Sequence, residues 1–189
     1  MPRVIVITGP SGVGKGTLIR GLLERLPQLE LSVSATTRSP RAGERDGVDY
    51  HFLTPAEFEA RLEAGAFLEH AMYAGNHYGT LRDEVLRRAD EGRPVVLEIE
   101  VQGARQVREA LPDALAVFIA PPSIEALRSR LVGRGTDSPD QVASRLETAR
   151  EELSARDEFA RVVVNDRLEQ AVEELVSIVE GAVKADPPR

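Results

Sequence analysis

Two glycines and a lysine near the N-terminus have the spacing of a loop that holds phosphate groups. The stretch ITGPSGVGKGTL, residues 7–18, contains Gly9, Gly14 and Lys15 between a β-branched run and a predicted helix. Glycines at such a turn let several backbone N–H groups point at one phosphate, and the helix dipole adds about half a positive charge. The lysine then reaches the terminal phosphates. The pattern predicts a nucleotide-binding loop.

The residue after the lysine departs from the commonest form of this loop. Gly16 stands where a serine or threonine normally holds Mg²⁺, and a hydroxyl follows one residue later at Thr17. The Gly-Lys-Gly-Thr variant is typical of small nucleotide kinases, in which phosphates and water supply most of the Mg²⁺ ligands. The Asn-Lys-x-Asp motif of signalling GTPases is absent, because Arg and Leu follow Asn165 and Asp166. The loop therefore favours a small kinase.

A second anion site is predicted in the stretch SATTRSPRAGERDGVDYHF, residues 34–52. Arg38 and Arg41 are three residues apart among hydroxyl side chains, with Tyr50 downstream. The planar fork of arginine suits phosphate oxygens, and hydroxyls can satisfy the remaining acceptors. Arginine is the default cation of this chain, since all of its 24 basic residues except Lys15 and Lys184 are arginine. Taken alone, the stretch is therefore equally compatible with a solvated basic turn.

The composition is that of a single globular domain. The 189 residues can bury about 70% of their unfolded surface, and 42% are hydrophobic and 29% charged. The absence of cysteine excludes disulfides and thiolate metal sites. A net charge of −7 argues against nucleic acid as a partner. The longest apolar run, residues 114–120, is too short to span a membrane. A strand predicted close to residue 1 leaves no room for a signal peptide, so we expect a cytoplasmic location.

The elements that must position these residues alternate along most of the chain. Strands are predicted over residues 3–8, 94–100, 114–120 and 161–165, and helices over 15–26, 102–111, from Ser123 onward, and 168–184. Each short β-branched run is followed by a helical segment. This alternation predicts a parallel sheet with helices on both faces.

Two segments interrupt the alternation. Residues 32–80 are polar and rich in turns, with a capping box at Thr54–Glu57 and a hairpin signal near Gly75. We expect a small inserted subdomain of mixed strand and helix there. The second interruption begins at residue 136, where Asp137 and Ser138 are predicted to cap a helix that runs to about residue 155.

A series of segments, in order along the chain, resembles the guanylate kinase family. They read GPSGVGKGT, TTRSPRAGERDGVDYHF, GAFLEH, GNHYGT, LEIEVQGA, RLVGRGTDS and VVVND, and span about residues 4–166. The resemblance implies an α/β P-loop fold with a parallel sheet, helices on both faces, an inserted mixed α+β GMP-binding subdomain and a helical lid. The implied divisions of this single domain are a core of residues 1–33, 81–131 and 156–189, a GMP-binding subdomain of residues 34–80, and a lid of residues 132–155.

The resemblance also implies a reaction and a set of site residues. ATP would pass its γ-phosphoryl group to GMP, and to dGMP, with Mg²⁺ as cofactor, in purine nucleotide metabolism. The implied catalytic residues are Lys15, Arg38, Arg134 and Arg145. The implied ATP-binding residues are Gly9, Pro10, Ser11, Gly12, Val13, Gly14, Lys15, Gly16, Thr17, Arg134 and Asn165. The implied GMP-binding residues are Ser34, Arg38, Arg41, Tyr50, Glu69, Tyr78, Thr80 and Glu100. Thr17 and Glu98 would contribute to Mg²⁺ binding, mostly through phosphates and water.

The chemistry of guanine suits Glu69. Guanine has two adjacent donors, N1–H and N2–H, and one carboxylate accepts both, whereas adenine would turn a lone pair toward it. Such a polar site can reject the wrong base by several orders of magnitude. Because the accepting phosphate is already ionised, catalysis requires positioning and charge neutralisation rather than a general base. We therefore assign no catalytic role to His51, His70 or His77.

The predicted lid depends on two arginines. Arg134 lies between Gly133 and Gly135, and Arg145 lies on the following helix. Neither position has the pattern of a core residue, so we expect both side chains to move onto the ATP phosphates when the lid closes. Two other positions depart from the family: His77 stands where tyrosine is frequent, and Glu100 where aspartate is common.

Two alternative functions stay open. One is a nucleoside monophosphate kinase for a different base, against which the residues 34–52 argue. The other is a non-catalytic guanylate-kinase-like module of a scaffolding protein, which typically has a damaged phosphate loop, whereas Gly9, Gly14 and Lys15 are intact. Release of ADP on mixing with ATP and GMP would distinguish them. The sequence leaves monomer and homo-oligomer equally open.

Overall fold

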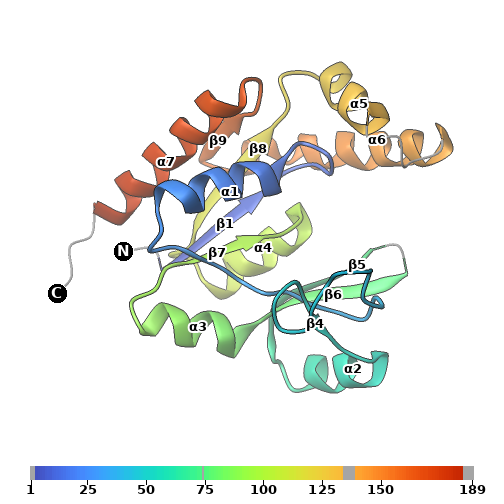
Figure 1. Cartoon of the computed structure of the whole chain (residues 1–189), viewed down its shortest axis with the longest axis vertical. Coiled ribbons are helices and arrows are strands. Elements are labelled where there is room, and N and C mark those ends of the chain that lie inside the picture. The colour runs from blue at the N-terminus through green and yellow to red at the C-terminus, as the bar shows by residue number, and fades with distance from the viewer. Residues whose placement is uncertain (1–2, 74, 134–138, 185–189) are drawn as a thin grey trace.

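Five parallel strands form the central sheet of the protein (Figure 1), in the order β2-β7-β1-β8-β9. A computed structural model describes residues 3–73, 75–133 and 139–184. The strands are β1 (Val4–Thr8), β2 (Glu30–Leu31), β7 (Val95–Glu98), β8 (Leu115–Ala120) and β9 (Arg161–Val164). The α/β fold class with a parallel sheet, expected from the sequence, is confirmed.

Both faces of this sheet are covered by helices. The helices are α1 (Lys15–Arg25), α3 (Arg82–Asp90), α4 (Val101–Ala110), α5 (Ile124–Gly133), α6 (Pro139–Ser154) and α7 (Leu168–Lys184). Ile5 and Ile7 of β1 pack in one apolar cluster with residues of α1, α5, α6 and α7. Val4 and Val6 pack in a second cluster with residues of α3 and α4. Burial on both faces explains why β1 is a continuous apolar run rather than an alternating one.

A second, smaller sheet is mixed and lies beside the first (Figure 1). Its strand order is β4-β3-β6-β5, with β3 parallel to β4 and the other pairs antiparallel. The strands are β3 (Ala35–Thr36), β4 (His51–Phe52), β5 (Phe67–Tyr73) and β6 (Asn76–Leu81), and α2 (Pro55–Glu63) packs on them. The core here is Ala35, Phe58 and Phe67, with the two phenylalanine rings stacked at 4.4 Å. The expected mixed segment and its hairpin are therefore present.

Helix boundaries follow the sequence signals closely. Thr54 and Glu57 form the predicted capping box at the start of α2. The Ser123 hydroxyl accepts a bond from the backbone N–H of Ala126, which caps α5. The proposed cap at Asp137 and Ser138 lies outside the described residues.

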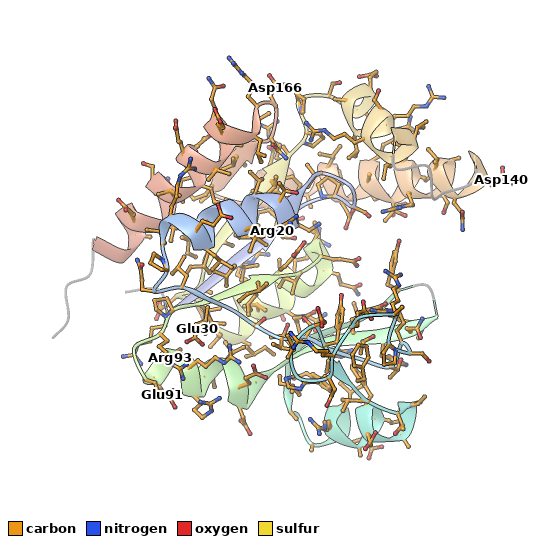
Figure 2. The ribbon with its side chains drawn as sticks, viewed as in Figure 1. Arg20, Glu30, Glu91, Arg93, Asp140 and Asp166 are labelled. Atoms are coloured by element: carbon orange, nitrogen blue, oxygen red, sulfur yellow. The ribbon has the colours of Figure 1, made fainter. Side chains whose placement is uncertain are left out.

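Two elements were not expected from the sequence. The strand β2 has two residues, and α3 buries only Val85 and Ala89. Ion pairs hold this region: Arg88 and Arg93 both reach Glu30, at 3.2 and 2.6 Å, and Arg93 also pairs with Glu91. Figure 2 shows Glu30, Arg93 and Glu91 gathered near α3. These two elements are too short or too polar to show a periodic apolar pattern; β2 is positioned by its pairing with β7, and α3 by the burial of Val85 and Ala89.

The Gln106 side chain connects α4, which covers the central sheet, to β5 of the smaller sheet. The Gln106 amide of α4 accepts from the His70 backbone N–H at 3.1 Å and donates to the His70 carbonyl at 2.9 Å. It thereby satisfies backbone groups of β5, an edge strand of the smaller sheet. Among the helices that the structure describes, none is long and apolar enough to cross a membrane.

Candidate active site

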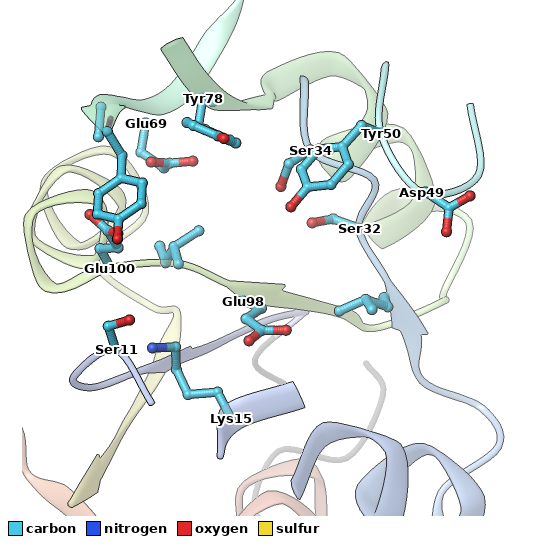
Figure 3. Close-up of a pocket in the computed structure, with 15 residues that line it drawn as sticks. Ser11, Lys15, Ser32, Ser34, Asp49, Tyr50, Glu69, Tyr78, Glu98 and Glu100 are labelled. Atoms are coloured by element: carbon cyan, nitrogen blue, oxygen red, sulfur yellow. The ribbon is translucent and has the colours of Figure 1, made fainter. Parts of the chain in front are cut away.

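A cavity of about 400 Å³ lies between the carboxyl end of β7 and the smaller sheet. Figure 3 shows Ser11 and Lys15 on one side of it, and Glu69, Tyr78, Ser34 and Tyr50 on the other. The lining residues are Ser11, Lys15, Leu31, Ser32, Ser34, Asp49, Tyr50, Glu69, Ala71, Tyr73, Tyr78, Gly79, Glu98, Ile99 and Glu100. Eight of them were predicted as site residues: Ser11, Lys15, Ser34, Tyr50, Glu69, Tyr78, Glu98 and Glu100.

The loop between β1 and α1 requires glycine at Gly9 and Gly14. Their φ angles are +137° and +99°, a region that L side chains avoid. A Cβ at Gly9 would lie 2.2 Å from the Ile119 carbonyl oxygen, and one at Gly14 would lie 2.7 Å from Asn165 Nδ2. The loop therefore packs closely on β8 and on the end of β9, with its backbone curved at the N-terminus of α1.

Two side chains fasten this loop through one carbonyl. The Val13 oxygen accepts from Asn165 Nδ2 at 2.8 Å and from Arg130 Nη1 at 3.2 Å. Arg130 also donates to the Asn165 carbonyl at 2.7 Å. Asn165 was expected to bind ATP, and here its amide supports the loop. Arg130 was not singled out from the sequence, where it is one arginine among many.

Lys15 begins α1 and lies against the loop. Its ammonium donates to the carbonyls of Gly9 and Pro10, at 2.5 and 3.3 Å. Burial lowers the pKa of Lys15 from its usual value, and the carboxylates of Glu98, Glu152 and Glu100 oppose that shift. The nearby acids thus favour the charged ammonium and oppose the effect of burial.

Glu98, at the end of β7, lies beside Gly16. A Cβ at Gly16 would stand 3.6 and 3.8 Å from the two Glu98 carboxylate oxygens. Burial raises the pKa of Glu98, while the Lys15 ammonium lowers it. Thr17, the other predicted metal residue, is exposed and does not line the cavity. Within residues 3–73, 75–133 and 139–184, no group of three or more His, Asp or Glu side chains is arranged to hold a metal ion.

Glu69 on β5 is a buried carboxylate, 6% exposed. It stands opposite Thr80 on β6, whose hydroxyl donates to Oε1 at 2.6 Å. Burial raises the pKa of Glu69 to about 6, the Thr80 hydrogen bond lowers it, and Glu100 raises it further. Gly103 of α4 makes this placement possible, because a Cβ there would lie 2.5 Å from Oε2. The glycine in the stretch VQGA was not recognised as a site residue.

The two predicted phosphate-binding arginines are not brought together at the cavity. Arg38 Nη2 bonds both oxygens of Glu44 at 2.9 Å, and its guanidinium lies 5.3 Å from the Tyr50 ring centre. Arg41 is exposed, and its backbone N–H donates to Glu44 at 2.7 Å. The expected cluster of positive charge is thus partly neutralised by Glu44, because this carboxylate accepts bonds from both residues.

Tyr50 and Tyr78 form the wall above Ser34. Their ring centres are 6.1 Å apart, in an edge-to-face arrangement. Glu100 is the residue before α4 and is half-buried. Thr80 is fully buried and acts through Glu69 rather than lining the cavity. The cavity also includes Ser32, Asp49 and Tyr73, which the sequence did not distinguish from other polar residues of the same segment.

The expectation for the lid needs a correction at Arg145. Arg134 lies outside the described residues. Arg145 was expected to lie outside the core with its side chain free to move; it is half-buried, and its Nη2 donates to Ser11 Oγ at 2.8 Å. The reason is that Val142, Leu146 and Ala149 bury one face of α6 in the core, which turns Arg145 toward the loop.

The comparisons with known proteins agree with one another. The sequence model of the guanylate kinase family matches residues 1–182. The guanylate kinase of Mycobacterium leprae (strain TN) is 55% identical over 183 residues, which cover 96% of this chain and 87% of the relative. That of Synechococcus sp. (strain CC9902) is 57% identical over 173 residues, 92% of each chain. A crystal structure of guanylate kinase from Anaplasma phagocytophilum is similar with a TM-score of 0.75 and 32% identity, covering 94% of this chain and 85% of that one. The chain therefore belongs to the guanylate kinase family.

Proposed function

We propose that this chain transfers the γ-phosphoryl group of ATP to GMP, giving ADP and GDP. The observation that supports this most directly is that one cavity has the Lys15 ammonium on one side and the buried Glu69 carboxylate on the other. The first suits a terminal phosphate and the second suits the paired donors of guanine. An enzyme that transfers a phosphoryl group from one nucleotide to another must bind both, with the donor phosphate facing the acceptor phosphate.

On the donor side, the loop of residues 9–17 would hold the ATP phosphates. Its backbone N–H groups lie at the N-terminus of α1, where the helix dipole favours an anion. Lys15 would reach the terminal phosphates. Arg145 bonds to Ser11 of the loop, so it is close enough to contact the phosphates together with Lys15. Asn165 would act by holding the loop at Val13. Arg134 remains a proposed phosphate ligand.

On the acceptor side, the smaller sheet would hold GMP. Glu69 would accept N1–H and N2–H of guanine, with Thr80 fixing one of its oxygens and Glu100 close by. Ser34, Tyr50 and Tyr78 line the cavity where the GMP phosphate would lie. Arg38 and Arg41 would reach that phosphate from the adjacent turn by exchanging part of their contact with Glu44.

Mg²⁺ fits the donor side of the cavity. The oxygens of Glu98 lie beside Gly16, close to the loop and to Lys15, and hard carboxylate oxygens are suitable Mg²⁺ ligands. Mg²⁺, when bound with ATP, neutralises charge on its phosphates. Glu98 would hold it directly or through water, and Thr17 is the second proposed contributor.

Other parts of the proposal concern the setting of the reaction. Residues 34–80 would act as the GMP-binding subdomain and residues 132–155 as a lid. We further propose dGMP as an alternative acceptor, a place in purine nucleotide recycling, and a cytoplasmic location. These rest on the family and on the size of the cavity rather than on a particular contact.

Mixing the protein with Mg²⁺, ATP and GMP tests the proposed function. ³¹P NMR should show ADP and GDP appearing in equal amounts. AMP, CMP and UMP in place of GMP should give at least 10³-fold lower kcat/KM, as expected for a polar base site. No ADP release with GMP would favour a binding module instead, and equal turnover of AMP would favour a kinase for another base.

A further inference from the structure

Helix α6 presents two opposite charges to the same residue of the phosphate-binding loop. Arg145 donates to Ser11 Oγ at 2.8 Å, and Glu152 Oε2 accepts from the Ser11 backbone N–H at 3.3 Å. The two side chains are seven residues apart, which places them on one face of a helix. Val142 precedes Arg145, and Leu146 and Ala149 lie between Arg145 and Glu152. All three apolar side chains are buried in the core, which fixes the position of the helix.

The Glu152 carboxylate also attracts the Lys15 ammonium electrostatically. It is half-buried, and burial raises its pKa while the Lys15 ammonium lowers it. Conversely, Glu152 is second only to Glu98 among the charges that favour the protonated form of Lys15. Glu98 lies beside Gly16, where Mg²⁺ and phosphates would engage it, which leaves Glu152 and then Glu100 as the acids that favour the charged lysine.

We propose that Glu152 is a positioning residue of the donor site, which holds the Ser11 backbone and the Lys15 ammonium in place and fixes α6 to the loop. The inference deepens the proposed function and rests on it. Glu152 adds a further negative charge near the loop, beside a cavity that Glu69, Glu98 and Glu100 already line. Its hydrogen bond with the Ser11 N–H and its attraction to Lys15 offset the repulsion between these carboxylates.

Two substitutions separate its hydrogen bond from its charge. Glu152→Gln keeps an oxygen that can accept from Ser11 N–H but removes the charge, and Glu152→Ala removes both. A hydrogen bond to a charged group is commonly equivalent to a tenfold change or more. We expect Glu152→Ala to lower kcat/KM for ATP about tenfold or more, and Glu152→Gln to give an intermediate loss. The KM for GMP should stay within about twofold of the wild-type value, because Glu152 faces the loop.

Glu147→Ala and Glu147→Gln are matched controls, since Glu147 is on the exposed face of the same helix. Both should behave as wild type. Glu152→Ala should also keep its effect in a Ser11→Ala background, because that substitution removes the Oγ bonded by Arg145 and leaves the backbone N–H. A purely structural role would instead lower the melting temperature and impair both substrates alike.

Failure of this inference is distinguishable from failure of the proposed function. If the wild-type protein releases no ADP from ATP and GMP, the function itself is wrong. If the wild type is active and Glu152→Ala equals Glu147→Ala, Glu152 has no positioning role. Tighter ATP binding in Glu152→Ala and Glu152→Gln would also overturn the proposal, because it would show that the carboxylate competes with phosphate.

Discussion

The phosphate-binding loop and the segment of residues 34–52 differ in what surrounds their glycines. A Cβ at Gly9 or Gly14 would lie less than 3 Å from an atom of β8 or of Asn165. A Cβ at Gly43 or Gly47 would meet no atom of the described residues within 4 Å. Both regions contain glycines with positive φ. The loop is therefore confined by its neighbours, while the acceptor segment turns through open space.

The contacts of the two regions differ in the same way. The Val13 carbonyl of the loop accepts bonds from the Asn165 amide and the Arg130 guanidinium, and the Val13 side chain is part of a large apolar cluster. In the acceptor segment Arg38 pairs with Glu44, and the small core beneath it has Ala35, Phe58 and Phe67 as its buried residues. The Arg38 guanidinium keeps the pKa of Glu44 below its usual value. The proposed donor loop is thus preorganised by packing, whereas the proposed acceptor segment is organised by charges, which we expect the GMP phosphate to rearrange.

The largest effect is expected at Glu69. Glu69→Gln leaves a donor amide facing two guanine donors, and truncating one partner of a buried charged hydrogen bond costs about 2–5 kcal/mol. GMP affinity should fall accordingly while ATP affinity is little changed. IMP lacks the N2 amino group, so its affinity should fall less than that of GMP when Glu69 is replaced by Gln. Equal losses for GMP and IMP would remove Glu69 from the guanine site, and Glu59→Gln, an exposed position on α2, is the control.

The next effect concerns the donor side. Lys15→Ala removes the ammonium that would neutralise the transferring phosphoryl group, and removal of one such stabilising donor commonly costs about 10²–10³ in kcat. Steady-state turnover with saturating ATP and GMP checks this. A variant with near-normal kcat would show that the loop holds phosphate without Lys15.

Arg38 should give a smaller effect that depends on the ligand. Arg38→Ala should weaken GMP about tenfold to a hundredfold, the equivalent of one charged hydrogen bond. Guanosine should be weakened hardly at all, because it has no phosphate. Comparison of the two dissociation constants by NMR titration is the test. Equal weakening would mean that Arg38 stabilises the smaller sheet rather than the phosphate.

The smallest effect is a pH dependence. The pKa of Glu69 is raised to about 6, and guanine requires its ionised form. Guanosine affinity should therefore fall below about pH 6, approaching tenfold per pH unit. The folding stability of the free protein depends on pH in the opposite direction to guanosine affinity. The stability contributed by protonated Glu69 is fully present below its unfolded pKa of 4.5 and is lost as pH rises through about 6. Guanosine is preferred here because its lack of phosphate removes the titration of the ligand, and a flat profile would contradict the assignment.

The sequence predicted the parallel core well for a physical reason. Strands such as β1 are buried on both faces, so their sequences are uninterrupted β-branched runs. The capping box of α2 joins Thr54 and Glu57, which are only three residues apart. Local rules decide such elements. The strand β2 and helix α3 were not predicted because contacts with residues distant in sequence position them: the pairing of β2 with β7 and the ion pairs of Arg88 and Arg93 with Glu30.

The candidate site was predictable in its residue types but not in its contacts. The spacing of the loop predicted Lys15, the resemblance supplied Glu69, and both line the cavity. It gave no indication that Gly103 must be small to admit Glu69, that Asn165 would bond Val13, or that Arg145 would rest on Ser11. Each of these depends on how elements distant in sequence pack together, which local sequence patterns do not determine.

Calorimetric titration of GMP into the wild type, Lys15→Ala and Arg38→Ala proteins tests the central claim most directly. The claim is that phosphate is bound at two separate places, one on the packed loop and one on the smaller sheet. We predict that Lys15→Ala binds GMP within about twofold of the wild type, while Arg38→Ala binds it at least tenfold more weakly. Equal weakening in the two variants would contradict the account, because it would mean that GMP depends on the loop as much as on the acceptor segment.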